Sequence, residues 1–136
     1  MAVKTKTKTV YERLRDKESM INQDLRFLFL QCADLEGVDL TGANLQGAKL
    51  AKANLRKSKL SGANMTGALL QGCDISGADL REANLANAIL AGAKFARCRL
   101  ANVNLLGANV SGANFKSSIG LPPDVKKALA ARGAIV

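Results

Sequence analysis

The sequence predicts an all-β solenoid, a four-sided parallel β-helix of about 4.5 coils with short helical caps at both ends. Three observations carry this prediction. A five-residue pattern runs through most of the 136-residue chain. Within each unit a small apolar, a polar and a large apolar residue alternate, which is the period of a strand. The two remaining positions are polar or Gly, which is typical of a turn.

The repeat is clearest between residues 33 and 117, where seventeen units follow one another without an insertion. The segment LFLQC at 28–32 adds a variant eighteenth unit. An α-helix is excluded, because a five-residue step would rotate its apolar face steadily around the axis. Each unit is therefore a very short strand and a corner. Four corners close a square, so twenty residues make one coil and the column is about 22 Å tall.

Two positions of each unit are predicted to point into the column. The central one is usually Leu, and the position two residues before it is usually Ala. Cys73 and Cys98 replace Ala at this second inward position, and we interpret them as small buried hydrophobic residues. Together with Cys32 they make an odd number, without a CxxC motif and in a chain without His. No metal site is therefore predicted.

The segments outside the repeat are expected to cover the terminal layers, which would otherwise expose apolar surface and unpaired strand edges. Thr9 and Glu12 form a capping box before an expected helix at 10–19. Pro122 or Pro123 suits the start of a second helix. The predicted organisation is a basic flexible tail at 1–9, an N-terminal cap at 10–27, the β-helix at 28–117 and a C-terminal helical cap at 118–136.

Residues 20 apart should lie directly above one another. One such column has alternating charge, and a second one could form a ladder of side-chain hydrogen bonds. The first column consists of Asp39, Lys59, Asp79 and Arg99, and the second of Asn44, Asn64, Asn84 and Asn104. Much of the surface charge is therefore expected to be paired along the stack.

The corners are expected to differ in their second turn residue. Gly suits the positive φ of a type II turn, and ten of the corners have Gly there. Four corners with a charged residue there should avoid positive φ, namely those at Lys52, Lys57, Glu82 and Arg97.

The net charge of +9, from 20 basic and 11 acidic residues, raises the question of nucleic-acid binding. The best argument for it is a basic cluster within residues 49–59, supported by Lys4, Lys6 and Lys8 near the N-terminus. The cluster consists of Lys49, Lys52, Arg56, Lys57 and Lys59. No basic stripe with interleaved aromatic residues accompanies it, so nucleic acid is not the favoured partner.

A possible interaction patch interrupts the polar outward positions. Leu69 and Ile89 stand one coil apart where Asp or Asn is expected, and Leu106 should lie nearby. Exposed apolar patches can mark contacts with a partner. The alternative is that these are tolerated surface aliphatic residues.

The repeats ADLEG, ANLQG and ADLRE resemble those of the pentapeptide-repeat family, whose consensus is A-(D/N)-L-x-x. The resemblance covers residues 28–117 and implies a right-handed quadrilateral β-helix. Some members of that family resemble DNA and bind gyrase, which gives quinolone resistance. Some form a homodimer through the C-terminal end. A DNA mimic needs a strongly acidic face, whereas this chain is basic.

These observations favour a non-enzymatic structural or interaction protein, a rigid scaffold whose partner is another protein. The chain has no His, no nucleophile elbow, no phosphate loop and no convergent carboxylate pair, so we expect neither catalysis nor a cofactor. It has no secretory signal and no apolar run long enough to span a membrane, so we expect a cytoplasmic protein. Two alternatives remain: a DNA-mimicking topoisomerase modulator, and a weak nucleic-acid binder. The oligomeric state is expected to be a monomer or a homodimer through the C-terminal cap.

Overall fold

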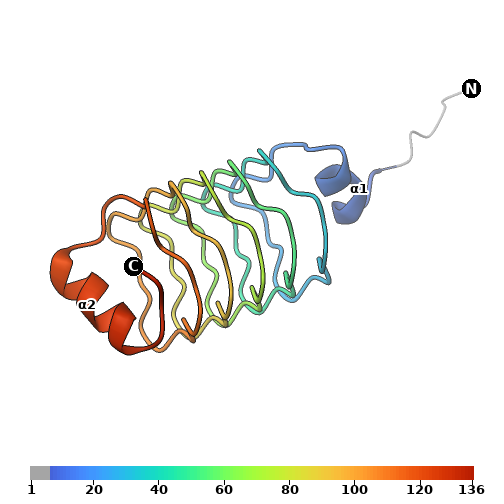
Figure 1. The fold of residues 1–136 in the computed structure, drawn as a ribbon. Helices are drawn as coiled ribbons and strands as arrows, with labels where there is room; N and C mark the ends of the chain where they lie inside the picture. Colours follow the sequence, from blue (N-terminus) through green and yellow to red (C-terminus); the bar gives the residue numbers. More distant parts are fainter. Residues whose placement is uncertain (1–6) are drawn as a thin grey trace, which may run out of the picture.

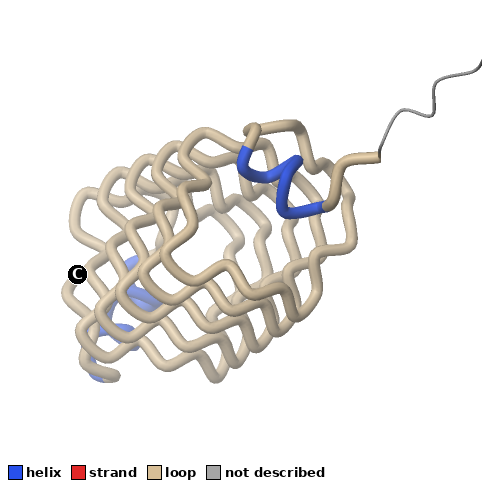
Figure 2. Tube along the Cα trace, turned by 90° about the vertical axis from the view of Figure 1, so that its right-hand side faces the viewer, coloured by secondary structure: helices blue, strands red, loops and turns tan. Residues whose placement is uncertain are grey.

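The computed structural model describes residues 7–136 as a single column of stacked coils. Figure 1 shows the coils side by side along one axis, with α1 (Val10–Arg15) at one end and α2 (Pro123–Ala131) at the other. Lys4 and Lys6, and most of the expected basic tail, lie outside the described residues. The view in Figure 2 shows the coils surrounding a common interior.

The strands are so short that each contributes a single bridge residue to the sheets. Every bridge in the described chain is parallel, and all but the last join residues 20 apart, as in Asp39 with Lys59. This spacing confirms four five-residue units per coil. From Asn44 onward each bridge residue donates its N–H toward the preceding coil, and as far as Leu100 the next residue in its unit donates toward the following coil. Lys49 N–H reaches Leu28 O at 2.8 Å and Leu50 N–H reaches Leu69 O at 2.7 Å.

The interior consists of the two predicted inward positions. Leu45, Leu55 and Leu80 are fully buried, and so are Ala43 and Ala63 in the other position. Leu and Ala alternate in this way because two large side chains per side would overfill a narrow square layer. Toward the C-terminal end the rings of Phe95 and Phe115 stack with their centroids 4.5 Å apart.

Two polar residues occupy inward positions and are satisfied locally. The Ser58 hydroxyl donates to Leu55 O at 2.7 Å, and the Ser118 hydroxyl donates to Phe115 O at 2.6 Å. Each hydroxyl therefore keeps a hydrogen bond while it stands where most units have Ala, which removes most of the penalty for burying it.

The stacking geometry begins earlier than the expected boundary at residue 28. Met20 and Leu25 are fully buried, and Asp24 already pairs with Asn44. The first units were missed because they lack the consensus: Glu18, Ser19 and Met20 replace Ala-Asp-Leu, and Phe27 stands where Gly is common. Residues 20–27 therefore belong to the first coil, and of the expected N-terminal cap at 10–27 only the part before Met20 lies outside the coils.

Helix α1 begins as predicted and ends sooner. The Thr9 hydroxyl accepts a hydrogen bond from the Glu12 N–H at 3.1 Å, and a Glu12 carboxylate oxygen accepts one from the Thr9 N–H at 2.8 Å. This reciprocal capping box confirms the predicted start. The helix ends at Arg15 rather than near Ser19. Its buried Leu14 packs against the apolar core.

The C-terminal segment does more than form a helix. Helix α2 has Pro123 in its first turn and buries Leu129, as a covering element should. After Gly133, with φ of +88°, the chain returns and Ile135 pairs with Asn114. Residues 134–136 thus add a further strand beyond the helix. The prediction of a helical cap at 118–136 therefore misses two features. One is this final strand, and the other is the bridge that Ile119 forms with Arg99 within the stack.

The predicted difference between the corners is wrong. Lys52, Lys57, Glu82 and Arg97 all have positive φ, between 57° and 61°, as the Gly corners do. The reason is that the second turn residue must donate its N–H to the next coil: Lys52 N–H reaches Gln71 O at 2.8 Å, and Gly62 N–H reaches Arg81 O at 2.9 Å. The ladder imposes one corner geometry on every residue type, at a cost of roughly 1 kcal/mol for a side chain with Cβ.

Candidate interaction surfaces

The outward residues form four sides, each named here by one member. The Asn64 side and the Leu69 side are neighbours, and the Asp74 side and the Asp79 side follow in chain order. The Asn64 side consists of Asp24, Asn44, Asn64, Asn84 and Asn104, and the Leu69 side of Phe29, Lys49, Leu69, Ile89 and Asn109. The Asp74 side consists of Asp34, Asn54, Asp74, Lys94 and Asn114, and the Asp79 side of Asp39, Lys59, Asp79, Arg99 and Ile119.

Asp and Asn at these positions stabilise the corner that follows them. The Asn64 Oδ1 accepts the backbone N–H of Thr66 at 3.1 Å and its hydroxyl at 2.7 Å. The Asp39 carboxylate accepts from the N–H and the hydroxyl of Thr41 in the same way. The hydrogen bond from the Thr41 hydroxyl is the main cause of the lowered pKa of Asp39. The consensus Asp or Asn is therefore a turn cap, a role that a side chain two residues before the donor can fill.

The Leu69 side departs from this pattern. Its first member Phe29 is 63% exposed, and the Lys49 ammonium lies 4.3 Å from the centre of the Phe29 ring. Leu69 and Ile89 follow as direct bridge partners and are half-buried. Neither can accept the corner N–H two residues on, so both give up a turn cap. Three neighbouring bridges therefore join an exposed aromatic ring to an aliphatic pair, with the charged Lys49 between them.

Leu106 does not belong to the Leu69 side. It lies in the corner between the Asn64 side and the Leu69 side, stacked next to Asn87, whose N–H donates to Leu106 O at 2.9 Å. It is 77% exposed and borders a groove of about 300 Å³ beside Val125 and Leu129 of α2. The sequence-predicted patch thus contains one direct pair, Leu69 with Ile89, and one separate residue near the C-terminal end.

The basic cluster does not converge on one surface. Lys49 lies on the Leu69 side and Lys59 on the Asp79 side, with the Asp74 side between them. Lys52, Arg56 and Lys57 occupy the two intervening corners. The five residues are therefore spread over two sides and two corners of one coil, and only Arg56, Lys57 and Lys59 lie next to one another, on one corner and the Asp79 side.

Charge is nevertheless unevenly distributed around the column. The Asn64 and Leu69 sides and the corner between them carry only Lys49 from residue 44 onward. The Asp74 and Asp79 sides and their shared corner carry most of the charged residues of the coils. One half of the column surface is thus nearly uncharged, and the other half is densely charged.

The alternating column lies on one side as predicted, but its expected ion pairs are not formed directly. Within residues 7–136, no ion pair joins Lys59 to Asp39 or to Asp79. Asp79 instead contacts Arg81 at 2.6 Å, two residues along its own strand and corner, and this contact is the main cause of its lowered pKa. One pair across the coils is present, between Arg56 and Asp74 at 4.0 Å.

The expected asparagine ladder is formed at one step only. The Asn104 amide donates to Asn84 Oδ1 at 3.2 Å. The Oδ1 atoms of Asn44, Asn64 and Asn84 accept corner N–H groups instead. The turn within each unit therefore competes with the ladder between units, and it takes most of these side chains.

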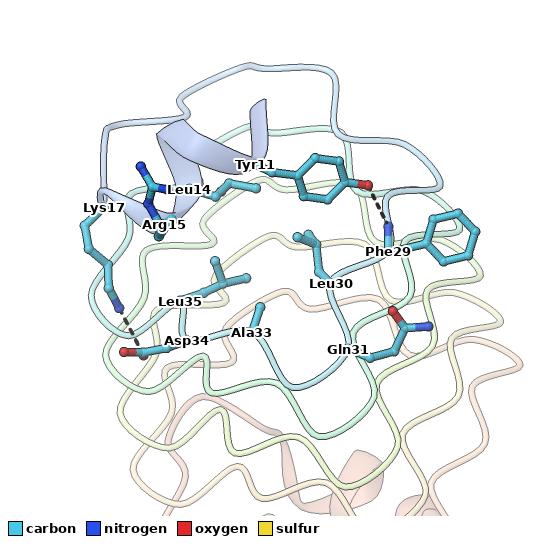
Figure 3. A pocket seen from close by; sticks show the side chains of 10 residues that line it. All are labelled: Tyr11, Leu14, Arg15, Lys17, Phe29, Leu30, Gln31, Ala33, Asp34 and Leu35. Atoms are coloured by element: carbon cyan, nitrogen blue, oxygen red, sulfur yellow. Dashed lines mark hydrogen bonds and ion pairs between the residues drawn. The ribbon is translucent and has the colours of Figure 1, made fainter. Parts of the chain in front are cut away.

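A recess of about 360 Å³ opens at the N-terminal end of the column, where sequence reasoning placed no site. Figure 3 shows it between α1 and the first coil, with Tyr11 and Leu14 above Leu30 and Leu35. The Tyr11 hydroxyl accepts the otherwise unpaired N–H of Phe29 at 3.2 Å, and Lys17 contacts Asp34 at 3.0 Å. Both contacts attach the N-terminal segment to the open edge of the first coil.

The inward cysteines are confirmed as buried residues. Cys73 and Cys98 are fully buried, and their thiols donate to Leu50 O and Ile75 O. Burial raises the pKa of each thiol to about 12. Cys32 is exposed. In the part of the chain that the structure describes, no group of three or more His, Cys, Asp or Glu side chains is arranged to hold a metal ion.

A column of five-residue units with Asp or Asn as turn caps defines a class of β-solenoid. Comparison with known proteins identifies the same class. The family model described as "Pentapeptide repeats (8 copies)" matches residues 24–56, 48–85 and 78–116. The chain therefore belongs to the pentapeptide repeat family. No curated protein sequence matches it.

Solved structures of family members are similar to this chain. HetL, a protein involved in heterocyst differentiation regulation in the cyanobacterium Nostoc sp. strain PCC 7120, is 36% identical with a TM-score of 0.76. The match covers 82% of this chain and 49% of HetL, so the chain spans about half the length of that relative. A pentapeptide repeat protein of the Arabidopsis thaliana thylakoid lumen is 31% identical, with a TM-score of 0.59 and coverage of 87% and 79%.

A second Nostoc pentapeptide repeat protein is 33% identical, with a TM-score of 0.65 and coverage of 75% of this chain and 83% of its own. The four-sided β-helix is thus the fold this chain shares with solved members of its family. Within residues 7–136 no helix is both long and apolar enough to cross a membrane.

Proposed function

We propose that this protein is a non-enzymatic scaffold that binds another protein along the Leu69 side of a rigid column, whose ends are closed by α1 and α2. The observation that carries the proposal is the pairing of Leu69 with Ile89 at two successive capping positions. Each gives up a corner hydrogen bond, worth about 1 kcal/mol. Each also exposes apolar surface that the column does not need for its own packing.

The surroundings of this pair suit a protein partner. The neighbouring Asn64 side is polar and uncharged from Asn44 onward, so a partner would desolvate few charges there. Protein interfaces commonly combine an apolar centre with a polar, hydrogen-bonding rim. Phe29 adds an exposed aromatic ring on the same side toward the N-terminal end, with the Lys49 ammonium beside it.

Binding of nucleic acid is less well supported. A basic groove or stripe that follows the phosphates is the usual requirement. Here the five residues of the basic cluster are spread over two sides and two corners of one coil, so they form no stripe along the column. A role as a DNA-mimicking topoisomerase modulator is also less well supported, because carboxylates do not follow one another along any side.

The test is affinity capture from the source cells with the double variant Leu69→Asn/Ile89→Asn. Asn is the residue that the same side has at Asn109, so the change restores the turn caps and keeps the fold. The matched control is Lys59→Asn/Arg99→Asn on the Asp79 side. We expect the first variant to lose a partner that the wild type and the control retain. Equal retention by both variants would contradict the proposal.

A further inference from the structure

We call the Asp74 side, the Asp79 side and the corner between them the charged edge. Its charges are arranged in bands across the column. Each coil contributes one sign. From the N-terminal end the four bands with at least two charges are Asp34, Glu36 and Asp39; Arg56, Lys57 and Lys59; Asp74 and Asp79; and Lys94, Arg97 and Arg99. The next coil adds a single charge, Lys116. The order of sign is therefore acidic, basic, acidic, basic, one coil or about 4.8 Å apart.

We propose that two copies of this chain associate side by side and antiparallel through the charged edge. In this orientation the first band meets the fourth band of the other copy, and the second meets the third. All four bands then face opposite charge at once. The two-fold axis passes between the second and third bands, so the contact is isologous and closes at two copies.

The geometry of a square column favours this arrangement. A two-fold axis perpendicular to the column reverses its direction but keeps each corner at the same place along the contact. The corner that holds Glu36, Arg56 and Arg97 therefore meets the same corner of the second copy. A parallel pair in register would bring like charges together in every band, and like charges at an interface cost several kcal/mol.

A parallel pair shifted by one coil is the nearest competitor. It would match opposite signs in only three bands and would leave one band of each copy without an opposite charge. The antiparallel pair is thus the arrangement that uses the whole pattern.

Most of the side chains concerned are accessible. Arg97, Arg99 and Glu36 are exposed, and Asp34 has 68% of its side chain exposed. Three carboxylates have partners within the same copy: Lys17 beside Asp34, Arg56 beside Asp74 and Arg81 beside Asp79. The contact would consist mainly of charged side chains at the surface, and exposed ion pairs contribute only about 0–1 kcal/mol each. The dimer is therefore weak and reversible.

The test reverses the sign of band four in one variant and of band one in another. Variant A carries Lys94→Glu, Arg97→Glu and Arg99→Glu. Variant B carries Asp34→Asn, Glu36→Lys and Asp39→Asn, in which Asn keeps the side-chain oxygen that accepts the corner N–H. Glu is acceptable at position 97, because Glu82 already adopts the same positive φ. Circular dichroism melting verifies that both variants fold.

Association is measured by sedimentation at constant ionic strength, with protein up to about 1 mM to detect a weak complex. We expect a wild-type dimer, and self-association at least about tenfold weaker in each variant alone. Variant A also has a lower net charge, which by itself would reduce the repulsion between copies and favour association. The expected loss of association in variant A is therefore not an effect of net charge. An equimolar mixture of the two variants should form a heterodimer, because both exchanged bands then face opposite charge.

Three results would overturn the proposal. The first is a wild type that stays monomeric throughout. The second is a wild-type dimer that variant A forms equally well, which would place the contact elsewhere, for example at α2. The third is a mixture of A and B that fails to associate although each folds, which would exclude the antiparallel register.

Discussion

The side-chain oxygen of Asn64 accepts the backbone N–H of Thr66 at 3.1 Å, whereas Leu69, one unit later, offers no acceptor to Gln71. The same corner geometry therefore occurs with and without a side-chain cap. We expect Asn64→Leu to lower the free energy of unfolding by about 1 kcal/mol. Urea unfolding measures the loss, and Leu69→Asn is the reciprocal control, expected to be neutral or stabilising. Equal stability of Asn64→Leu and wild type would show that the cap does not matter.

Leu80 and Leu69 differ in direction. Leu80 is fully buried in the column, and Leu69 is half-buried on its surface. Leu80→Asp places an unpaired carboxylate in the core and should cost several kcal/mol or prevent folding. Leu69→Asp should change the melting temperature little. Thermal melting followed by circular dichroism compares them, and equal losses would be incompatible with the inward and outward assignment.

Two glycines with positive φ predict different costs for the same substitution. A Cβ added at Gly92 would meet nothing within 4 Å, whereas one at Gly120 would lie 2.5 Å from the Ala101 backbone nitrogen. Gly92→Ala therefore adds only backbone strain, about 1 kcal/mol. Gly120→Ala should cost clearly more, because the last coil must shift. Denaturant unfolding of both variants measures the two losses of stability. A larger loss for Gly92→Ala than for Gly120→Ala would contradict this prediction.

The buried thiols predict a loss of stability in alkaline solution. Burial raises the pKa of Cys73 and Cys98 from 9.0 to about 12, so the folded state binds protons that the unfolded state releases. Their contribution is complete below pH 9 and is lost as pH rises toward 12, by up to about 1.4 kcal/mol per pH unit for each thiol.

The variant Cys73→Ala/Cys98→Ala uses the residue that most units have at this position. Its unfolding free energy should fall less steeply than that of the wild type between pH 9 and about 11. A thiol reagent at pH 8 should label Cys32 in the folded protein before the other two. Identical pH slopes for the two proteins would contradict the assignment.

The charge pattern predicts no effect on DNA gyrase at low micromolar concentration. A DNA mimic must present carboxylates where phosphates would lie. Here the acidic bands at residues 34–39 and 74–79 are separated by Arg56, Lys57 and Lys59. A basic DNA-binding surface would meet alternating attraction and repulsion. A supercoiling assay with and without a quinolone measures this, and stoichiometric inhibition or protection would support the topoisomerase alternative.

The sequence by itself determined the repeat, the register and the core. Inward Leu and Ala recur every five residues, so only one register buries them, and residues such as Asp39 and Lys59 must then lie one above the other. The capping box of Thr9 and Glu12 was also predictable, because both partners lie within four residues.

Only the tertiary structure decided the corners, the ends and the surfaces. Lys57 adopts positive φ because its N–H must reach Ser76 O in the next coil, a partner that local propensity does not contain. Ile135 pairs with Asn114 after an intervening helix, which breaks the five-residue spacing. Lys49 and Lys59 are close in sequence but lie on different sides of the column. For Lys57 and Ile135 the determining contact is between residues of different coils, which no short window of sequence brings together.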